Sequence, residues 1–343
     1  MYKDYALIIG INDYTREDSD LPQLHGAIKD AEGFEEWFVK DSGNDDANGI
    51  EKHFESVYSK CDPLTPVYDV IEKALGKLLK KAEEEPALNR RLYFYFAGHG
   101  IGLDYDTTNN ALCLADWSEK KRGNALSSKD YHNTFIKLGL FRQVIILLDC
   151  CREIKVNVYP RPPEETPMAG SGPHQAEVFW GYATKFNNLA HEIDTENGDK
   201  RGAFTYVLMN GLRGGAANED GIIDSVNLKK YLDRYVPVAA NRDKLSQKPE
   251  INNGLTEPES IFAKVDPGLV PCAIQFQSHR TGPVLLVDGL GKTIEKIVDA
   301  GGKKITIDLK KGKYLLKDEL NHEVHPINIE SFRFPINPIA INF

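Results

Sequence analysis

No apolar run in the 343-residue sequence approaches membrane-spanning length, so we expect no transmembrane helix. The five cysteines are an odd number with two adjacent, which argues against a disulfide framework. We therefore expect a reducing, cytoplasmic location, where a free thiol stays reactive. Residues 1–4 lead directly into a predicted strand, and we expect no signal peptide. The net charge of −9 opposes general binding of nucleic acid or anionic membranes.

Motifs for metals and nucleotides are incomplete. Residues 218–224 resemble the middle of a calcium loop, but Ala216 stands at the first ligand position and Asn227 at the position of the final glutamate, so the full set of oxygen ligands is not available. Residues 289–293 lack the full spacing of a phosphate-binding loop, and we interpret them as a hairpin turn. We find no zinc-ligand cluster in the sequence, and we predict no metal centre and no required cofactor. Weak calcium binding stays open at an acidic loop that holds Asp194, Glu196 and Asp199.

Two short apolar runs end in residues that carry chemistry. Residues 92–96 and 144–148 are rich in aromatic and β-branched side chains, which is typical of buried parallel strands. His99 follows the first run and Cys151 the second, just beyond the carboxyl ends at which α/β sheets place their sites. A thiol beside an imidazole is the minimum set of groups for nucleophilic acyl transfer. The sequence therefore predicts a Cys–His site at this edge of a parallel sheet.

The first 266 residues alternate predicted strands with predicted helices. Capping signals support this order, as where Ser127 and Gly139 bracket one helix. Such alternation indicates an α/β fold in which helices flank both faces of a mostly parallel sheet. We expect strands at 5–11, 54–58, 92–97, 111–115, 144–149 and 177–182, and helices at 26–39, 65–85, 127–138, 204–212 and 224–235.

The composition changes at residues 266–268, after which short alternating runs are separated by glycine-rich turns. This pattern is typical of antiparallel hairpins. We therefore predict one domain over residues 1–266 and a small β-rich module over residues 267–343. In the first domain, the proline-rich segment 152–174 is expected to be a mobile, poorly structured loop. The runs of the module are 273–276, 284–287, 293–298, 303–309 and 313–316.

Five ordered segments, over roughly the first three quarters of the chain, resemble the caspase-like cysteine peptidases. The turn 97–100 resembles the family's Ser/Ala-Gly-His-Gly motif, and residues 149–151 resemble the Asp-x-Cys motif of metacaspases. His99 precedes Cys151 by a distance comparable to the spacing of about 50 residues in caspases. The resemblance implies a caspase-like α/β domain. The other similar segments are the opening strand at 5–12, the segment 24–31 and the late turn into a helix at 201–205.

Cys151 is our candidate nucleophile, and His99 is the residue expected to take its proton and later protonate the leaving amine. Because neighbouring side chains of a strand point to opposite faces, only one of the adjacent cysteines faces His99. The Asp-x-Cys match selects Cys151, and Cys150 is then expected to be a small core residue. The resemblance implies an oxyanion hole formed by the backbone N–H groups of Gly100 and Cys151. A glycine suits a close backbone approach to the substrate.

Two aspartates carry the prediction of specificity. In metacaspases, aspartates matching Asp30 and Asp149 line the pocket for the residue before the cut, and they select arginine or lysine. Carboxylates suit this task because they form charge-assisted, bidentate bonds with a guanidinium. The resemblance therefore implies cleavage after Arg or Lys. An alternative interpretation of Asp30 is a solvated residue on the surface of a helix.

We predict a cysteine endopeptidase that acts on protein or peptide substrates through a thioester. By resemblance, it is expected to be latent until a signal or an activating protein partner releases it, in defence or programmed death. Weak calcium dependence would fit the metacaspases. Arg152, Lys155 and Arg161 follow the nucleophile and suit the expected pocket, and Arg161 is the favoured point of self-cleavage. Two alternatives stay open: a catalytically silent scaffold whose β module binds partners, and another acyl transferase or amidase.

Overall fold

The structure is a computed structural model, and its chain groups into two compact units. One unit is formed by Met1–Arg213 and Ile223–Lys264, and the other by Gly214–Ile222 and Val265–Phe343. The domain boundary predicted at residue 266 lies outside the described residues. In the part of the chain that is described, no helix is long and apolar enough to cross a bilayer. The described residues are 2–15, 21–42, 52–84, 89–165, 176–195, 198–218, 220–256, 261–265, 270–310, 312–329 and 339–343.

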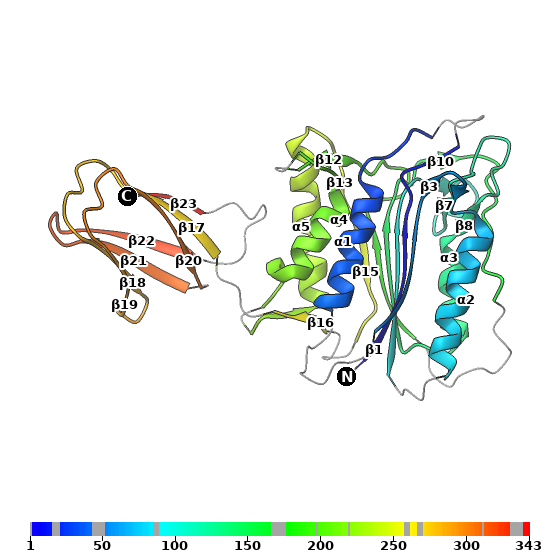
Figure 1. Ribbon diagram of the computed structural model, residues 1–343, viewed down its shortest axis with the longest axis horizontal. Helices are drawn as coiled ribbons and strands as arrows, with labels where there is room; N and C mark the ends of the chain where they lie inside the picture. The colour runs from blue at the N-terminus through cyan, green and yellow to red at the C-terminus, as the bar shows by residue number, and fades with distance from the viewer. Residues whose placement is uncertain are drawn as a thin grey trace. The chain divides into compact units, whose positions relative to one another are not determined.

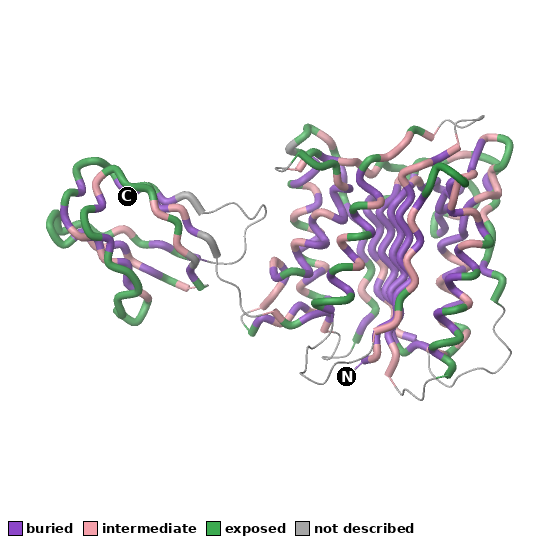
Figure 2. Tube along the Cα trace, viewed as in Figure 1, coloured by how far each residue is buried: buried purple, intermediate pink, exposed green. Residues whose placement is uncertain are grey.

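A six-stranded sheet forms the centre of the first unit (Figure 1). Its order is β15-β11-β9-β5-β1-β2, and every pairing is parallel except that of β15 with β11. The central strands are buried along their length (Figure 2). The sheet confirms the predicted α/β fold. The strands are β1 Lys3–Gly10, β2 His53–Tyr58, β5 Arg90–Ala97, β9 Gln143–Asp149, β11 Glu177–Tyr182 and β15 Glu250–Asn253.

Helices cover both faces of this sheet. Helices α1, α4 and α5 lie on one face, and α2 and α3 lie on the other (Figure 1). Helix α3 begins after the N-cap Ser127, whose side chain accepts a hydrogen bond from Asp130 N, as the sequence predicted. Helix α4 continues into a π-helical turn at Gly211–Gly215. The helices are α1 Ala27–Lys40, α2 Tyr68–Glu84, α3 Ser128–Lys137, α4 Ala203–Asn210 and α5 Ser225–Arg242.

Short strands beyond the carboxyl ends of the central strands surround the predicted site. One small sheet has the order β10-β6-β7-β8, and β12 pairs with β13 in a hairpin after β11. Two further pairs are β3 with β4 and β14 with β16. The second pair lies away from the site, near the start of β5, where Arg91 donates a hydrogen bond to the Ile261 carbonyl. The bounds of these short strands are β3 Lys60–Cys61, β4 Leu64–Thr65, β6 Gly100–Leu103, β7 Asn110–Cys113, β8 Ala125–Ser127, β10 Ile154–Lys155, β12 Glu192–Asp194, β13 Lys200–Gly202, β14 Ile222–Asp224 and β16 Ile261–Lys264.

Two helices differ from their predicted bounds. The helix expected from residue 65 begins at Tyr68, because Thr65 instead pairs with Lys60 in the hairpin of β3 and β4. The helix expected to end at residue 235 continues to Arg242, although Pro237 lies inside it. A proline removes one N–H donor from a helix, and here the helix tolerates that loss.

The segment after Cys151 is ordered as far as residue 165, so the prediction of a mobile loop is wrong for this part. Residues Ile154–Lys155 form β10, which pairs with β6. Arg161 N donates to the Ala125 carbonyl, and Ser127 N donates to the Arg161 carbonyl, each at 2.8 Å. The prolines and charges suggested disorder, but composition does not reveal backbone pairing with distant strands. Residues 166–175 lie outside the described residues.

The second unit is a β module with an apolar core of its own. One sheet has the order β20-β17-β23 and the other β19-β18-β21-β22. The predicted runs correspond to β17–β21, whereas β22 and β23 were missed. Pro326 inside β22 hid that strand, since a proline weakens a strand pattern. The strands are β17 Val270–Gln275, β18 Val284–Asp288, β19 Thr293–Ile297, β20 Lys304–Leu309, β21 Gly312–Asp318, β22 Glu323–Ile329 and β23 Ile339–Asn342.

Candidate active site

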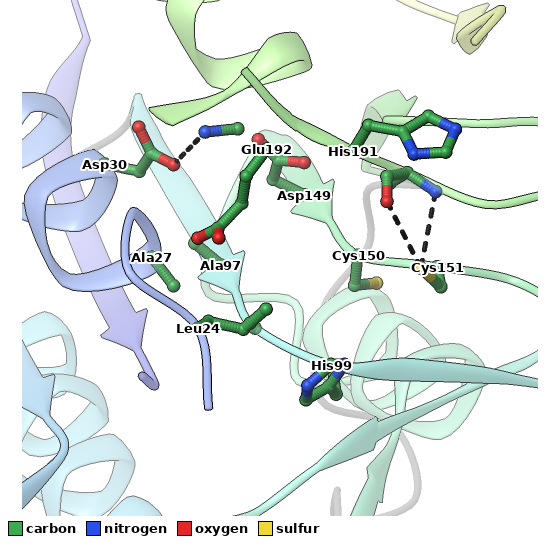
Figure 3. A pocket seen from close by; sticks show the side chains of 13 residues that line it. Leu24, Ala27, Asp30, Ala97, His99, Asp149, Cys150, Cys151, His191 and Glu192 are labelled. Carbon is green, nitrogen blue, oxygen red and sulfur yellow. Dashed lines mark hydrogen bonds between the residues drawn. The ribbon is translucent and has the colours of Figure 1, made fainter. Parts of the chain in front are cut away.

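His99 and Cys151 lie just beyond the carboxyl ends of neighbouring strands. Ala97 ends β5 and Asp149 ends β9, and these two residues pair in register. Gly98 N also donates to the Asp149 carbonyl at 3.1 Å, which continues the pairing by one residue. His99 and Cys151 are both half-buried and line one pocket of about 190 Å³ (Figure 3). The structure therefore brings together the two residues that the sequence selected.

His99 is held by one contact of its ring and one of its backbone. Its Nε2 lies 2.8 Å from the Pro22 carbonyl oxygen, and its backbone N donates to the Tyr14 hydroxyl at 2.7 Å. Because a carbonyl only accepts hydrogen bonds, Nε2 carries the proton and Nδ1 keeps its lone pair. Burial lowers the pKa of His99, while the Pro22 contact acts in the opposite direction. The resting imidazole is therefore neutral, with Nδ1 as its basic nitrogen.

The thiol of Cys151 lies against the backbone of Ala190 (Figure 3). Ala190 N donates to Sγ at 3.3 Å, and the thiol donates to the Ala190 carbonyl at 3.4 Å. Burial raises the pKa of Cys151, although the Ala190 N–H acts to lower it. The resting site thus holds a neutral thiol, and an efficient nucleophile requires removal of its proton.

Cys150 is buried, in line with its predicted place in the core. Its Sγ accepts a hydrogen bond from Asn110 Nδ2 at 3.2 Å. Burial raises the pKa of the Cys150 thiol well above its usual value, and the neighbouring Cys151 adds to this effect. Cys151 is the more exposed of the two thiols, which favours it as the nucleophile.

Gly100 lies directly against the cysteine pair. A Cβ at this position would lie 2.5 Å from the Cys151 carbonyl oxygen and 2.6 Å from Cys150 Sγ. The missing side chain therefore makes room for the protein's own cysteines, whereas the sequence reasoning invoked room for substrate. Gly100 and Cys151 are brought together as the predicted oxyanion hole requires, and that role stays a prediction.

Both predicted carboxylates line the pocket and are buried. Asp149 Oδ2 accepts hydrogen bonds from Thr205 N at 2.9 Å and from Thr205 Oγ1 at 2.7 Å. Burial raises the pKa of Asp149 to about 6, although the Thr205 bonds act to lower it. Asp30 accepts from Gly202 N at 2.7 Å and forms an ion pair with Arg201. The alternative of a solvated Asp30 is therefore wrong, because helix α1 turns this side chain inward.

A third carboxylate, Glu192, was missed by the sequence reasoning. It lines the same pocket, and its Oε1 accepts a hydrogen bond from His25 N at 2.9 Å and another from Gly26 N. Figure 3 shows its carboxylate extending toward Ala27 and Ala97. Glu192 lies on β12, which the sequence reasoning did not predict. The acidic residues near position 192 are the sequence feature that points to a carboxylate here, but from the sequence that loop is interpreted only as a weak calcium site.

The acidic loop considered for calcium is engaged by lysines. Asp194 forms an ion pair with Lys200, and Asp199 forms one with Lys29. Glu196 lies outside the described residues. Over the described ranges, no group of three or more potential metal ligands comes together. Weak calcium dependence stays a prediction.

Arg152 is not accessible as a processing site. Its side chain is 2% exposed, and its guanidinium forms an ion pair with Glu250 and lies 3.9 Å from the centre of the Tyr182 ring. The expectation that a protease reaches this residue is therefore wrong for the folded chain. Burial of a cation demands such a partner and stacking surface.

The other two processing candidates are also engaged. Lys155 Nζ pairs with Glu119 Oε1 at 2.8 Å. The Arg161 guanidinium lies 4.9 Å from the centre of the Tyr68 ring, and its backbone is paired with β8. A protease needs an extended, unpaired backbone, and the structure does not present one at Arg161.

The parallel sheet, with its cysteine and histidine beyond neighbouring strand ends, defines a caspase-like cysteine peptidase domain. Residues 3–258 match the caspase domain, peptidase family C14, and the chain belongs to that family. A probable protease from a Desulfuromonadales bacterium is 31% identical over 230 residues, which are 62% of this chain and 26% of that protein. The chain thus spans about a quarter of that relative's length. The crystal structure of caspase-1 from Spodoptera frugiperda is similar with a TM-score of 0.46 and 13% identity, over 75% of this chain and 88% of that one.

Proposed function

We propose that this protein is a cysteine endopeptidase of the metacaspase type that cleaves after arginine or lysine. The observation that carries the proposal is one pocket in which Cys151 and His99 lie beside the buried carboxylates of Asp30 and Asp149 and the half-buried carboxylate of Glu192. The thiol and the imidazole supply nucleophile and base. The carboxylates supply the counter-charge for a basic side chain.

The reaction begins when His99 Nδ1 takes the proton from Cys151 Sγ. The thiolate attacks the carbonyl carbon of the scissile bond, and the resulting oxyanion accepts hydrogen bonds from the N–H groups of Gly100 and Cys151. His99 then protonates the leaving amine, which leaves a thioester on Cys151. Water, deprotonated by His99, hydrolyses the thioester and restores the thiol. The Pro22 carbonyl stabilises the transient imidazolium, because it accepts the Nε2 proton throughout.

The three carboxylates differ in how far they are already neutralised. Asp30 has Arg201 as a charged partner. Asp149 accepts hydrogen bonds from Thr205, and Glu192 accepts them from backbone N–H groups, so neither is paired with a cation among the described residues. Asp149 and Glu192 are therefore the main partners of an incoming guanidinium or ammonium. An aspartate before the cut would add a fourth carboxylate, which like-charge repulsion opposes.

Fluorogenic peptides that differ only in the residue before the cut test this proposal. Substrates with Arg, Lys, Asp and Leu are compared for the wild type and Cys151→Ala. We expect cleavage after Arg and Lys by the wild type alone. A preference for Asp or Leu would contradict the assignment of the pocket, and equal activity of Cys151→Ala would contradict the nucleophile.

We also propose that the peptidase has a low basal activity at rest, in a reducing cytoplasm, and that a signal or a protein partner raises it. The contact of Ala190 with Cys151 Sγ supports this, because a substrate has to displace it. Backbone hydrogen bonds of 3.0 Å from Arg152 N to the Asn188 carbonyl and from Asn187 N to the Arg152 carbonyl hold the same segment. The rate at which iodoacetamide alkylates Cys151, compared with the rate at which it alkylates the open thiol of glutathione, tests latency. Reaction at the rate of an open thiol would contradict it.

A catalytically silent scaffold is the second candidate. The raised pKa of Cys151 and its contacts with Ala190 are the observations that favour it. An electrophilic peptide probe that labels Cys151 would contradict the scaffold, whereas a thiol that no probe reaches would support it.

A further inference from the structure

Asn110 is a buried residue that connects the small sheet beside the site to both cysteines. It is the first residue of β7, and its side chain has no exposed surface. Its Nδ2 donates to the Cys151 carbonyl oxygen and to Cys150 Sγ, each at 3.2 Å. The assignment of the amide follows from chemistry, since the carbonyl oxygen of Cys151 requires a donor.

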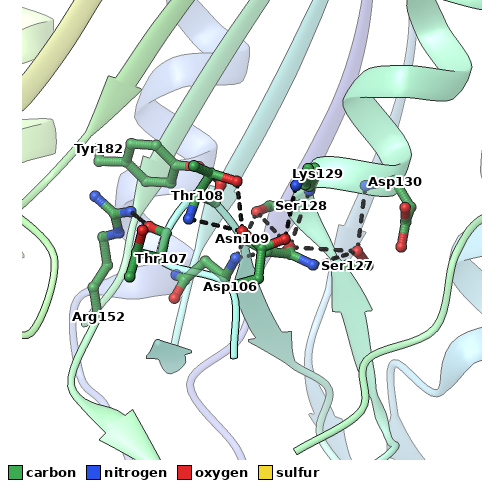
Figure 4. Close-up of polar contacts among 11 residues, drawn as sticks. Asp106, Thr107, Thr108, Asn109, Ser127, Ser128, Lys129, Asp130, Arg152 and Tyr182 are labelled. Carbon is green, nitrogen blue, oxygen red and sulfur yellow. Dashed lines mark hydrogen bonds and ion pairs between the residues drawn. The ribbon is translucent and has the colours of Figure 1, made fainter. Parts of the chain in front are cut away.

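The backbone of Asn110 is fixed independently of its side chain. Asn110 N donates to Asn109 Oδ1 at 2.8 Å and to Ser128 Oγ at 3.0 Å. Asn109 Oδ1 also accepts from Lys129 N at 3.1 Å, and its Nδ2 donates to Ser127 Oγ at 3.0 Å (Figure 4). This network ties β7 to the first turn of helix α3. The amide of Asn110 is therefore presented to the cysteines from a rigid support.

The Asn110 side chain also destabilises the core, because one of its polar atoms is left without a partner there. Its Oδ1 is buried and has no hydrogen-bond partner among the described residues. A buried, unsatisfied acceptor destabilises a protein, so an apolar side chain would serve the core better. Compared with an apolar side chain, Asn110 provides an N–H donor, and this donor reaches Cys150 and Cys151.

The Cys151 carbonyl is also confined by Gly100. A Cβ on Gly100 would lie 2.5 Å from this oxygen, so the oxygen packs directly against the glycine backbone. The Asn110 donor and the close packing against Gly100 together restrict the peptide that follows Cys151. Fixing this peptide sets the backbone angles of Cys151, and with them the directions of its Sγ and its N–H.

We propose that Asn110 is a positioning residue for Cys151, which holds the thiol and the backbone N–H in the orientation that acyl transfer requires. This inference rests on the proposed function, because it assumes that Cys151 is the nucleophile. A misplacement of about 1 Å at a reacting group lowers the rate about 100-fold. The pocket carboxylates lie on other elements, so binding of the basic side chain does not depend on Asn110.

Asn110→Ala and Gln143→Ala form a matched pair for the test, since both remove a buried amide, and Gln143 lies at the start of β9, at the opposite end of that strand from the cysteines. Active sites are counted with an irreversible peptide probe, so that kcat refers to folded, titrated enzyme. We expect Asn110→Ala to lower kcat about 100-fold with little change in KM. Gln143→Ala should lower the melting temperature and leave kcat per titrated site close to the wild type. An unchanged kcat in Asn110→Ala, or an equal loss in both variants, would overturn the proposal.

Asn110→Asp is a second variant of the same shape, and it replaces the donor by a carboxylate oxygen facing the Cys151 carbonyl. We expect it to lose more kcat than Asn110→Ala. Mass spectrometry after iodoacetamide treatment gives a readout independent of peptide cleavage. In the wild type we expect label on Cys151, and in Asn110→Ala a higher share on Cys150, because the pair is no longer held. If the ratio of label on Cys150 to label on Cys151 did not change in Asn110→Ala, the positioning role would be overturned, whether or not the wild type cleaves peptides. A wild type that cleaved no peptide would instead refute the proposed function.

Discussion

The carboxylates of Asp30 and Asp149 approach each other across Gly202. A Cβ on Gly202 would lie 2.2 Å from Asp149 Oδ2 and 3.0 Å from Asp30 Oδ2. Burial, with the nearby charge of Asp149, raises the pKa of Asp30 to about 8, against the opposing effect of Arg201. Two carboxylates that share a site resist ionising together, and a bound cation relieves this cost. The pair is therefore suited to a positively charged side chain.

The first prediction concerns pH. The pKa of Asp149 is raised to about 6 and that of Asp30 to about 8, so the free pocket gains negative charge as pH rises through this range. We expect the ratio of kcat/KM for an arginine substrate over its neutral citrulline counterpart to increase from pH 5 to pH 8. The titrations of His99 and Cys151 change kcat/KM by the same factor for both substrates, so they cancel in the ratio. A ratio that stays flat, or falls with pH, would show that these carboxylates do not contact the substrate.

The second prediction separates the adjacent cysteines. Cys151→Ala should abolish cleavage, because it removes the thiol that lines the pocket beside His99. Cys150→Ala should retain most activity, since this thiol is buried and its pKa is raised well above the usual value. Peptide cleavage per milligram of folded protein measures both. An inactive Cys150→Ala with an active Cys151→Ala would reverse the assignment.

The third prediction concerns the pocket carboxylates. Asp149→Ala should lower kcat/KM for arginine substrates about 100-fold, as expected when a buried charge pair loses one partner. Glu192→Gln keeps the shape of the side chain but removes its charge, and we expect a loss of about tenfold. Asp194→Asn is the control, because Asp194 is exposed and pairs with Lys200. Losses that are the same for arginine and leucine substrates would argue for a structural effect.

The fourth prediction concerns Gly100. Gly100→Ala adds a Cβ that meets the Cys151 carbonyl oxygen at 2.5 Å, and we expect loss of cleavage with a destabilisation of about 1–3 kcal/mol. Gly76→Ala on helix α2 is the matched control, since no atom lies within 4 Å of its added Cβ. That control should gain about 1 kcal/mol of stability and keep full activity. Thermal unfolding and cleavage assays measure both effects, and an active Gly100→Ala would show that the cysteines tolerate displacement.

The fifth prediction concerns self-cleavage. Because Arg152 is buried and Arg161 is paired with β8, we expect no cut after either residue in the folded protein. Intact-mass spectra of the incubated wild type and Cys151→Ala should show both bonds intact. A cut after Arg161 in the wild type alone would mean that this backbone opens before activation.

The sequence was sufficient to predict the five parallel strands of the central sheet and the placement of His99 and Cys151 at one edge of it. It did not predict the antiparallel edge strand β15, and the strand expected at 111–115 lies in the small sheet as β7. Buried parallel strands have distinctive composition, and their carboxyl ends share one edge. It did not reveal Glu192, because the hairpin of β12 and β13 is too short to leave a periodic pattern. It also failed for the segment after Cys151, whose order comes from backbone pairing with distant strands such as that of Arg161. Such pairing depends on tertiary structure, which local sequence does not encode.

The central claim is that Cys151 is a nucleophile beside a pocket for a basic side chain. Labelling with a peptidyl acyloxymethyl ketone that carries arginine, followed by mass spectrometric mapping, tests both parts at once. We predict a single adduct on Cys151, absent in Cys151→Ala, slowed in His99→Ala, and far less abundant with the matching aspartate probe. An adduct on Cys150, or faster labelling by the aspartate probe, would contradict the account.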